Sequence, residues 1–238
     1  MSIERNTSRI NWHQALAEVA LIGAGILIAL TVDSWWEERL ERKDEIEYLQ
    51  SLQSDFEANE GELNKQFIEE ERIVSLGKEL HAHINSGFRD ISSAELNVLI
   101  GNFFWLYEWQ PITGTYDEML GSGRLLYLRN KLLRGKLSQY VHQLEEIKAT
   151  EREGFTSWYF EQSPYLRQHL NMSRFEWISD YEPTTRFGED IQALQSREFH
   201  NLVTAWMVAH GDAVNLYREA VNAGDEILEL IASELSTD

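Results

Sequence analysis

ALAEVALIGAGILIALTVDSWW, residues 15–36, is the one long apolar stretch of a chain that is otherwise rich in charged side chains. From residue 19 to residue 32 every side chain is apolar or small, apart from Thr31. A stretch of this length with so few charges is typical of a transmembrane helix. We therefore predict a membrane-spanning helix over residues 12–36, preceded by a short N-terminal tail over residues 1–11.

Tryptophan side chains stand at both ends of the predicted span. Trp12 precedes the apolar stretch, and Trp35 and Trp36 close it. Indole rings are enriched at the two boundaries between membrane and water, so these residues are the expected interface anchors. A helix from Trp12 to Trp35 covers roughly 34 Å at about 1.5 Å per residue, and the hydrocarbon layer is about 30 Å thick. The span therefore fits a bilayer with modest tilt.

Two other interpretations of the apolar stretch are open. A cleaved signal peptide has an apolar region of about 7–15 residues, which the core at residues 19–32 matches. However, Asp33, Ser34 and the tryptophans after this core do not form a small-x-small cleavage site. A buried helix of a soluble protein is the second alternative, because Glu18 and Asp33 interrupt the ends of the stretch. We favour an uncleaved membrane anchor.

The basic residues that flank the span leave its orientation nearly balanced. Two arginines precede it, and Arg39, Arg42 and Lys43 follow it, so the positive-inside rule favours neither side strongly. The chain has no cysteine, which suits an oxidising compartment where a stray thiol would mispair. We expect the short tail inside the cell and the helical domain of residues 37–238 outside the cytoplasmic membrane.

One face of the predicted span carries small and acidic side chains. At about 100° per residue, Glu18, Gly25, Ala29 and Asp33 fall on one side of the helix. Gly25 and Ala29 form a small-x-x-x-small pair, which lets another helix approach closely. We expect this face to associate with a second copy or with another membrane protein. Two alternatives are that Glu18 is an ion or proton site, as acids inside membranes often are, and that its carboxylate simply reaches the headgroups.

The rest of the chain has the pattern of an all-α domain. A stripe of helical period contains Ile46, Leu49, Leu52, Phe56, Leu63, Phe67 and Val74. We therefore expect the membrane helix to continue into a long helix, with a break near Gly61 left open. Further helices are expected after Ser92, over residues 132–147 and from Ser196 onward, and no alternating strand pattern of useful length occurs. The predicted fold is all-α, with a single transmembrane helix that continues into a long-helix, bundle-like domain.

The sequence contains no recognisable catalytic, cofactor or metal motif. His210 lies on an apolar helix face, where a histidine is more often a core residue than a ligand. A formal net charge of −19 disfavours binding to the phosphate backbone of nucleic acids. We therefore expect no catalytic residues, no cofactor, no metal and no nucleic-acid partner. A membrane-surface enzyme built from the irregular residues 155–188 is kept as an alternative.

A glycine turn precedes the densest group of basic residues in the chain. Gly121 and Gly123 permit the left-handed backbone of a tight turn between helices. The basic cluster that follows, with Asn130 inside it, comprises Arg124, Arg129, Lys131, Arg134 and Lys136. This cluster could bind an acidic partner, a lipid headgroup or the domain's own acidic helices. Charge balance within the chain is the simplest of these roles.

Two segments are similar to one known family. Residues 18–38, EVALIGAGILIALTVDSWWEE, and residues 114–137, GTYDEMLGSGRLLYLRNKLLRGKL, together resemble a family of small bacterial membrane proteins of unknown function. The chain departs from the family's pattern at residues 33–36 and at Arg129, which stands before Asn130. The resemblance implies one N-terminal membrane helix followed by a helical domain, and it implies no activity. In a bacterium, the expected location is the inner membrane, with the large domain in the periplasm.

These features predict a non-enzymatic single-pass membrane protein in contact with lipid. We expect it to be oligomeric, through self-association or through another membrane protein. The helical domain is expected to dock a partner or to sense something in the cell envelope. An ion- or proton-coupling membrane subunit that uses Glu18 is the main alternative.

Overall fold

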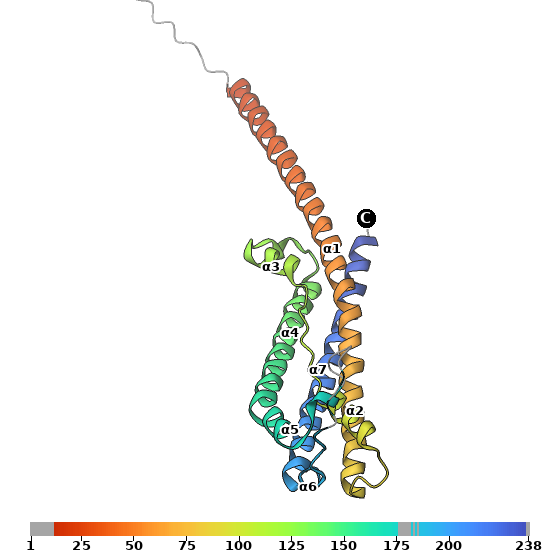
Figure 1. The fold of residues 1–238 in the computed structure, drawn as a ribbon. Helices are drawn as coiled ribbons and strands as arrows, with labels where there is room; N and C mark the ends of the chain where they lie inside the picture. Colours follow the sequence, from red (N-terminus) through yellow and green to blue (C-terminus); the bar gives the residue numbers. More distant parts are fainter. Residues whose placement is uncertain (1–11, 176–181, 183, 185, 237–238) are drawn as a thin grey trace, which may run out of the picture. The chain divides into compact units, whose positions relative to one another are not determined.

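The computed structural model describes residues 12–175, 182, 184 and 186–236, with side chains from Leu16 onward. These residues form helices and no strand, so the predicted all-α class is confirmed. The chain divides into two compact units between Tyr48 and Leu49. The elements in Figure 1 are α1 (Trp12–Ser86), α2 (Ser93–Phe103), α3 (Gly114–Gly121), the 3-10 turn η1 (Arg124–Tyr127), α4 (Lys131–Ser157), the π-helical turn η2 (Trp158–Gln162), α5 (Ser163–His169), the 3-10 turn η3 (Met172–Arg174), α6 (Ile191–Leu194) and α7 (Arg197–Ser236).

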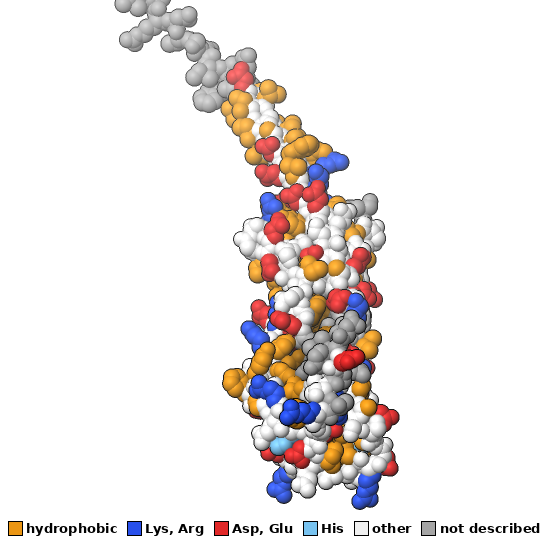
Figure 2. Space-filling view, viewed as in Figure 1, with side chains coloured by type: hydrophobic (Ala, Val, Ile, Leu, Met, Phe, Trp, Pro, Cys, Tyr) orange, Lys and Arg blue, Asp and Glu red, His pale blue; other side chains and the backbone are white. Residues whose placement is uncertain are grey.

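The apolar stretch lies in the first unit and belongs to helix α1. Its most apolar 18-residue window has a mean hydropathy of 2.0, and none of this window is buried within the chain. Hydrophobic side chains cover this part of α1 in Figure 2. The core helix of a soluble protein would bury such side chains, because removing apolar surface from water is the main force that drives folding. By length and composition, the stretch can cross a membrane.

Helix α1 runs from Trp12 to Ser86 as one helix, so the break considered near Gly61 does not occur. A glycine inside a helix costs only about 1 kcal/mol relative to alanine. Contacts on both sides of Gly61 compensate for this cost. Leu63 is buried, and the side-chain amide of Asn59 donates to the carbonyl oxygen of Ile112 at 2.7 Å and accepts from its N–H at 2.8 Å.

In the second unit, α1, α4 and α7 pack along buried residues that are spaced three, four or seven apart. This is the spacing of coiled coils, and α7 runs antiparallel to the other two helices in Figure 1. We call these rows the heptad seam. Its members are Leu49, Leu52, Phe56, Asn59, Leu63, Gln66, Glu70, Ile73, Gly77 and Leu80 of α1, Leu133, Leu137, Tyr140, Leu144 and Ile147 of α4, and Phe199, Val203, Trp206, His210, Ala213, Tyr217, Ala220, Ile227 and Ile231 of α7.

The predicted apolar stripe follows this seam only in its first part. The predicted residues from Leu49 to Leu63 are buried as expected. Beyond them Phe67 and Val74 are half-buried, and Gln66 and Glu70 occupy the buried positions instead. Beyond Leu63, apolar residues no longer mark the buried face of α1, because polar side chains occupy the heptad positions there.

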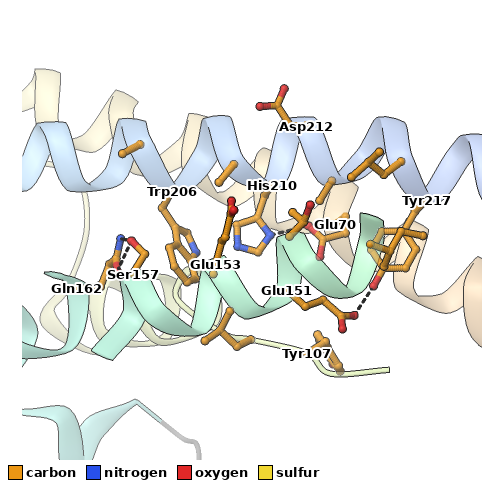
Figure 3. Close-up of a pocket in the computed structure, with 18 residues that line it drawn as sticks. Glu70, Tyr107, Glu151, Glu153, Ser157, Gln162, Trp206, His210, Asp212 and Tyr217 are labelled. Carbon is orange, nitrogen blue, oxygen red and sulfur yellow. Dashed lines mark hydrogen bonds and ion pairs between the residues drawn. The ribbon is translucent and has the colours of Figure 1, made fainter. Parts of the chain in front are cut away.

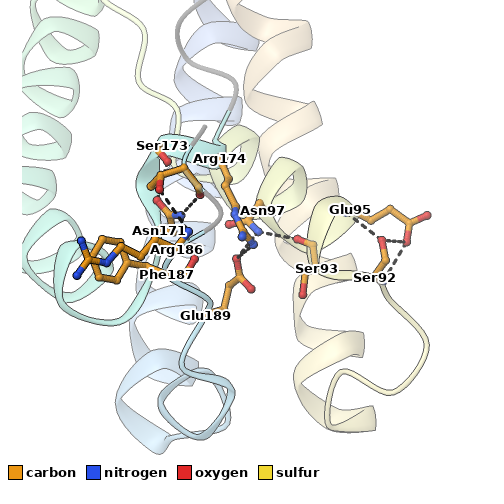
Figure 4. A network of polar contacts seen from close by, with 11 residues as sticks. Ser92, Ser93, Glu95, Asn97, Asn171, Ser173, Arg174, Arg186, Phe187 and Glu189 are labelled. Carbon is orange, nitrogen blue, oxygen red and sulfur yellow. Dashed lines mark hydrogen bonds and ion pairs between the residues drawn. The ribbon is translucent and has the colours of Figure 1, made fainter. Parts of the chain in front are cut away.

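Helix α2 is fixed by a cap at its start and by a polar network (Figure 4). The Oγ of Ser92 accepts the N–H of Glu95 at 3.3 Å, and the Glu95 carboxylate accepts the N–H of Ser92 at 3.0 Å, which is a capping box. The amide of buried Asn97 donates to Glu189 at 2.7 Å, and Arg174 donates to the same carboxylate at 2.9 Å. Burial raises the pKa of Glu189, but hydrogen bonds from Asn97, Ser93 and the backbone, together with the charge of Arg174, hold the pKa below its usual value. The network therefore ties Arg174 and Glu189 to α2.

Candidate functional site

The predicted association face of the membrane helix lies on α1. Glu18, Gly25, Ala29 and Asp33 are all exposed in the single chain. A Cβ added at Gly25 would meet no described atom within 4 Å, so the described chain's own packing does not require a glycine there. The four residues are accessible to a second helix, and their role in association stays a prediction.

The expected interface tryptophans are described in part. Trp12 is the first residue of α1, and its side chain lies outside the described residues. Trp35 and Trp36 are more than half exposed, and the guanidinium carbon of Arg39 lies 5.4 Å from the centroid of the Trp35 ring. Exposed indoles beside an arginine have the composition of a membrane–water boundary. Contact of these residues with lipid stays a prediction.

The glycine turn lies between α3 and η1. Gly121 is the last residue of α3, and Gly123 has a φ of +75°, in the left-handed region that favours glycine. Asn130 then caps α4, because its Oδ1 accepts the N–H groups of Leu132 at 2.9 Å and Leu133 at 3.1 Å. The amide nitrogen of Asn130 donates to Glu234 of α7 at 2.9 Å. Asn130 therefore fixes the start of α4 and also joins it to α7.

Two members of the basic cluster interact with the rest of the domain. Lys136 forms an ion pair with Glu226 of α7, and Arg134 donates a hydrogen bond to the carbonyl oxygen of Leu128. These contacts support charge balance within the chain as the role of these two side chains. Arg124, Arg129 and Lys131 are the exposed members of the cluster.

A cleft that sequence analysis did not anticipate opens along the heptad seam between α1, α4 and α7 (Figure 3). Its volume is about 360 Å³, which is the size of a small-molecule site. Apolar side chains such as Trp206, Ile147 and Leu216 form part of its wall. The polar part of the wall consists of a His–Glu pair, a Tyr–Glu pair and a hydroxyl–amide pair. We call this site the seam cleft.

His210 and Glu70 form the buried His–Glu pair of the seam cleft. Nδ1 of His210 lies 2.5 Å from Oε2 of Glu70, and the side chains are only 10% and 11% exposed. With the hydrogen on Nδ1, the imidazole donates it to the Glu70 carboxylate. The imidazole centroid lies 4.9 Å from the ring of Trp206, one turn earlier in α7. His210 is thus the buried residue that its apolar helix face predicts, and it also lines a cleft.

Glu151 and Tyr217 form the second polar pair. The hydroxyl of Tyr217 donates to Oε1 of Glu151 at 2.7 Å, and the N–H of Trp109 lies 3.4 Å from the same oxygen. Burial raises the pKa of Glu151, the two hydrogen bonds oppose this shift, and the nearby carboxylates of Glu108 and Glu70 add to it. Burial and the bond to Glu151 also raise the pKa of Tyr217, so its hydroxyl remains a donor.

Helix α4 ends beside the seam cleft in the π-helical turn η2. The side-chain amide of Gln162 donates to Oγ of Ser157 at 3.0 Å, and both residues line the cleft. Gln162 is almost completely buried. Turns of this kind are rare in proteins and occur frequently at functional sites. The turn therefore brings a hydroxyl and an amide to the wall of the cleft.

The polar atoms of the seam cleft form neither a metal site nor a catalytic triad among the described residues. In the described part of the chain, no group of three or more histidine or acidic side chains could hold a metal ion. The hydroxyl of Ser157 interacts with Gln162 and Glu161, so no serine–histidine–carboxylate triad forms around His210 among the described residues. The cleft combines an apolar wall with a few convergent polar groups, which is the composition of ligand sites.

The functional residues that sequence reasoning missed are Glu70, Glu151 and Tyr217. Glu70 and Glu151 are ordinary members of a very acidic composition, and their own sequence neighbourhoods carry no motif. One signal could have identified Glu70. It stands three residues before Ile73 and seven after Leu63, so it continues a row of core residues as a charged member. A charge at a core position of a heptad pattern indicates a buried partner or a site.

Comparisons with protein-family models, with curated proteins and with solved structures found no match. Membership of the family that residues 18–38 and 114–137 resemble stays a prediction.

Proposed function

We propose that the chain is a single-pass membrane protein whose helical domain binds a small ligand, and that it acts as a membrane-anchored sensor. The observation that carries this proposal is the seam cleft, whose wall contains the buried His210–Glu70 pair. Removing such a pair from water is costly, and apolar residues would pack equally well at the same positions. A buried polar pair that faces a cleft is therefore better explained by a binding role than by stability.

Binding is preferred to catalysis because the cleft lacks an activated nucleophile among its described residues. His210 is oriented by Glu70 as a general base would be. However, the nearby hydroxyls of Ser157 and Tyr217 interact with Gln162 and Glu151 instead. The proposal is consequently a non-enzymatic one.

The experiment for ligand binding uses a variant that fills the cleft. Ala209 lines the cleft on α7 and is exposed, so Ala209→Phe adds a ring without disturbing the core. The full chain is incubated with a cell metabolite extract and analysed by native mass spectrometry. We expect a bound small molecule on the wild type and on the control Ala58→Phe, whose site is exposed on α1, and not on Ala209→Phe. Equal occupancy of all three proteins, or of none, contradicts the proposal.

The exposed apolar stretch of α1 supports the membrane anchor. The resemblance of residues 18–38 and 114–137 to bacterial membrane proteins supports the bacterial inner membrane as its location. We expect the full chain to stay with the membrane fraction after extraction with alkaline carbonate, which removes peripheral proteins. Recovery of intact chain in the supernatant contradicts the anchor.

The orientation of the large domain can be tested because the chain has no cysteine. Ser54 is exposed on α1 after the apolar stretch, and Ser8 precedes the stretch. We expect a membrane-impermeant maleimide to label Ser54→Cys in intact cells, and to label Ser8→Cys only after the cells are permeabilised. The reverse pattern places the large domain in the cytoplasm.

A further inference from the structure

The charged side chains that line the seam cleft are acidic. Glu70, Glu151, Glu153 and Asp212 contribute carboxylates, and no lysine or arginine lines the cleft among the described residues. In Figure 3 the Asp212 carboxylate points away from the other polar groups, whereas Glu151 and Glu70 point toward their partners inside the cleft. The imidazole of His210 is the one basic side chain among the described lining residues, beside four carboxyl groups. This composition is complementary to a ligand that carries a positive charge.

The free nitrogen of His210 is a second, independent observation. The side chain is nine-tenths buried, and its Nδ1 is already bound to Glu70. No hydrogen bond from a described residue reaches Nε2, and the ring lines the cleft. With the hydrogen on Nδ1, Nε2 of the neutral imidazole presents a lone pair. Nε2 is not one of the buried side-chain atoms that lack a partner among the described residues. It is therefore open to the cleft, where it can accept a hydrogen bond from a donor on the ligand.

Glu151 lacks a cationic partner among the described residues. Its carboxylate accepts hydrogen bonds from Tyr217 and Trp109, and its charged neighbours, Glu108 and Glu70, are themselves acids. A half-buried carboxylate in such surroundings is stabilised by any positive charge that comes near it.

The remaining wall of the cleft suits an apolar body. Trp206 and Ile147 are almost completely buried, and Leu216 and Ala213 continue the wall along α7. The rings of Trp206 and Tyr107 also line the cleft, and an aromatic face attracts an ammonium group. The volume of about 360 Å³ limits the ligand to a small molecule.

We propose that the seam cleft binds a small organic cation, an amine with an apolar body, whose ammonium group is held by Glu151 with Nε2 of His210 as a further acceptor. This inference rests on the proposed function, because it assumes that the cleft is a ligand site, and it adds the chemical class of the ligand.

The test compares three probes that share one body and differ in charge. They are 2-phenylethylamine, 2-phenylethanol and 3-phenylpropionate, titrated calorimetrically at neutral pH into the full chain in lipid nanodiscs, with empty nanodiscs as the blank. We expect the amine to bind at least about tenfold more tightly than the alcohol and the carboxylate, because hydrogen bonds between charged groups are about twice as strong as neutral ones. Equal binding of the three probes, tighter binding of the carboxylate, or no binding of the amine overturns the proposal.

Two matched variants locate the charge. Glu151→Gln keeps the size of the side chain and an acceptor for Tyr217, and it is expected to weaken amine binding about tenfold. Glu219→Gln makes the same change on an exposed carboxylate of α7 that does not line the cleft, and it is expected to change binding less than twofold. Equal weakening by both variants shows a general charge effect and overturns the assignment to Glu151. The thermal unfolding midpoint of each variant shows whether that variant is folded. The comparison of the three probes uses the wild type and does not depend on the folding of any variant.

The outcomes separate this inference from the proposed function. If the alcohol or the carboxylate binds best and Ala209→Phe abolishes that binding, the proposal of a cationic ligand is wrong. The proposal that the cleft binds a small ligand is then still supported. If native mass spectrometry also finds no ligand that Ala209→Phe removes, the proposed function fails as well.

Discussion

His210 of α7 and Glu70 of α1 meet inside the heptad seam, with 2.5 Å between Nδ1 and Oε2. Replacing Glu70 alone by leucine leaves the Nδ1 hydrogen without an acceptor, so the free energy of unfolding should fall by about 1–3 kcal/mol. The double variant Glu70→Leu/His210→Leu leaves no buried polar group, and it should cost less than either single change. Chemical unfolding of the four proteins gives the coupling. A double variant whose cost equals the sum of the single costs would show that the two side chains do not interact.

A second prediction compares two helical glycines. A Cβ at Gly101 of α2 would lie 2.8 Å from both the Cβ and the carbonyl oxygen of Phe175. Because backbone cannot move aside cheaply, Gly101→Ala should lower the free energy of unfolding by about 1–3 kcal/mol. Gly135 of α4 is exposed, and a Cβ there meets no described atom within 4 Å. Gly135→Ala should therefore raise the free energy of unfolding by up to about 1 kcal/mol. Thermal unfolding decides the signs. An unchanged or raised stability of Gly101→Ala would contradict the contact with Phe175, and a loss of stability in Gly135→Ala would contradict the open space at that position.

The raised pKa of Glu151 predicts the pH dependence of stability. Burial keeps the native carboxyl protonated to a higher pH than its usual value of 4.5. The native state then binds more protons than the unfolded state in this interval, so the free energy of unfolding falls as the pH rises from about 4.5 through the native pKa. Glu151→Gln lacks this titration and should gain stability relative to the wild type over the same interval.

Unfolding midpoints measured between pH 4 and pH 8 test this sign. Asp212→Asn serves as a control that removes an exposed carboxyl from α7. A wild type that gains stability relative to Glu151→Gln as the pH rises would refute the burial of this carboxyl.

The Glu18 face of α1 predicts self-association. Glu18→Leu and Glu18→Gln each remove the carboxyl group, and Gly25→Ile blocks close approach of a second helix. Cross-linking in bilayers should show a smaller oligomer for Gly25→Ile than for the control Gly23→Ile, whose side chain points to another side of the helix. Assemblies of unchanged size in all variants would leave Glu18 as a carboxylate that reaches the headgroups. A proton flux in liposomes that is lost in Glu18→Gln would favour the ion-coupling alternative instead.

The long helices of this chain could be predicted because their cause is local. The apolar stretch, the Ser92 cap and the period of the apolar residues each act within a few turns, and the helices follow them. The continuity of α1 through Gly61 was not predictable from the glycine alone. Two residues before Gly61, Asn59 forms hydrogen bonds with Ile112, which lies far along the chain.

The seam cleft could not be predicted because it depends on three helices that are distant in the sequence. Glu70, Glu151 and His210 become neighbours only when the register of α1, α4 and α7 is known. The rule that core residues are apolar also hides such a site from prediction. It predicts that Glu70 lies outside the buried seam and that His210 is a core residue with no binding role.

The π-helical turn at Trp158–Gln162 has a consequence for insertions and deletions. A π turn holds one residue more than an α-helical path of the same course. Deleting one residue from it would rotate α5 by about 100° around its axis. Tyr165 would lose its hydrogen bond to the carbonyl oxygen of Ala193, at 2.8 Å, and Leu166 would leave the core. The rotation of α5 about its axis relative to α4 is therefore set by the number of residues in this turn.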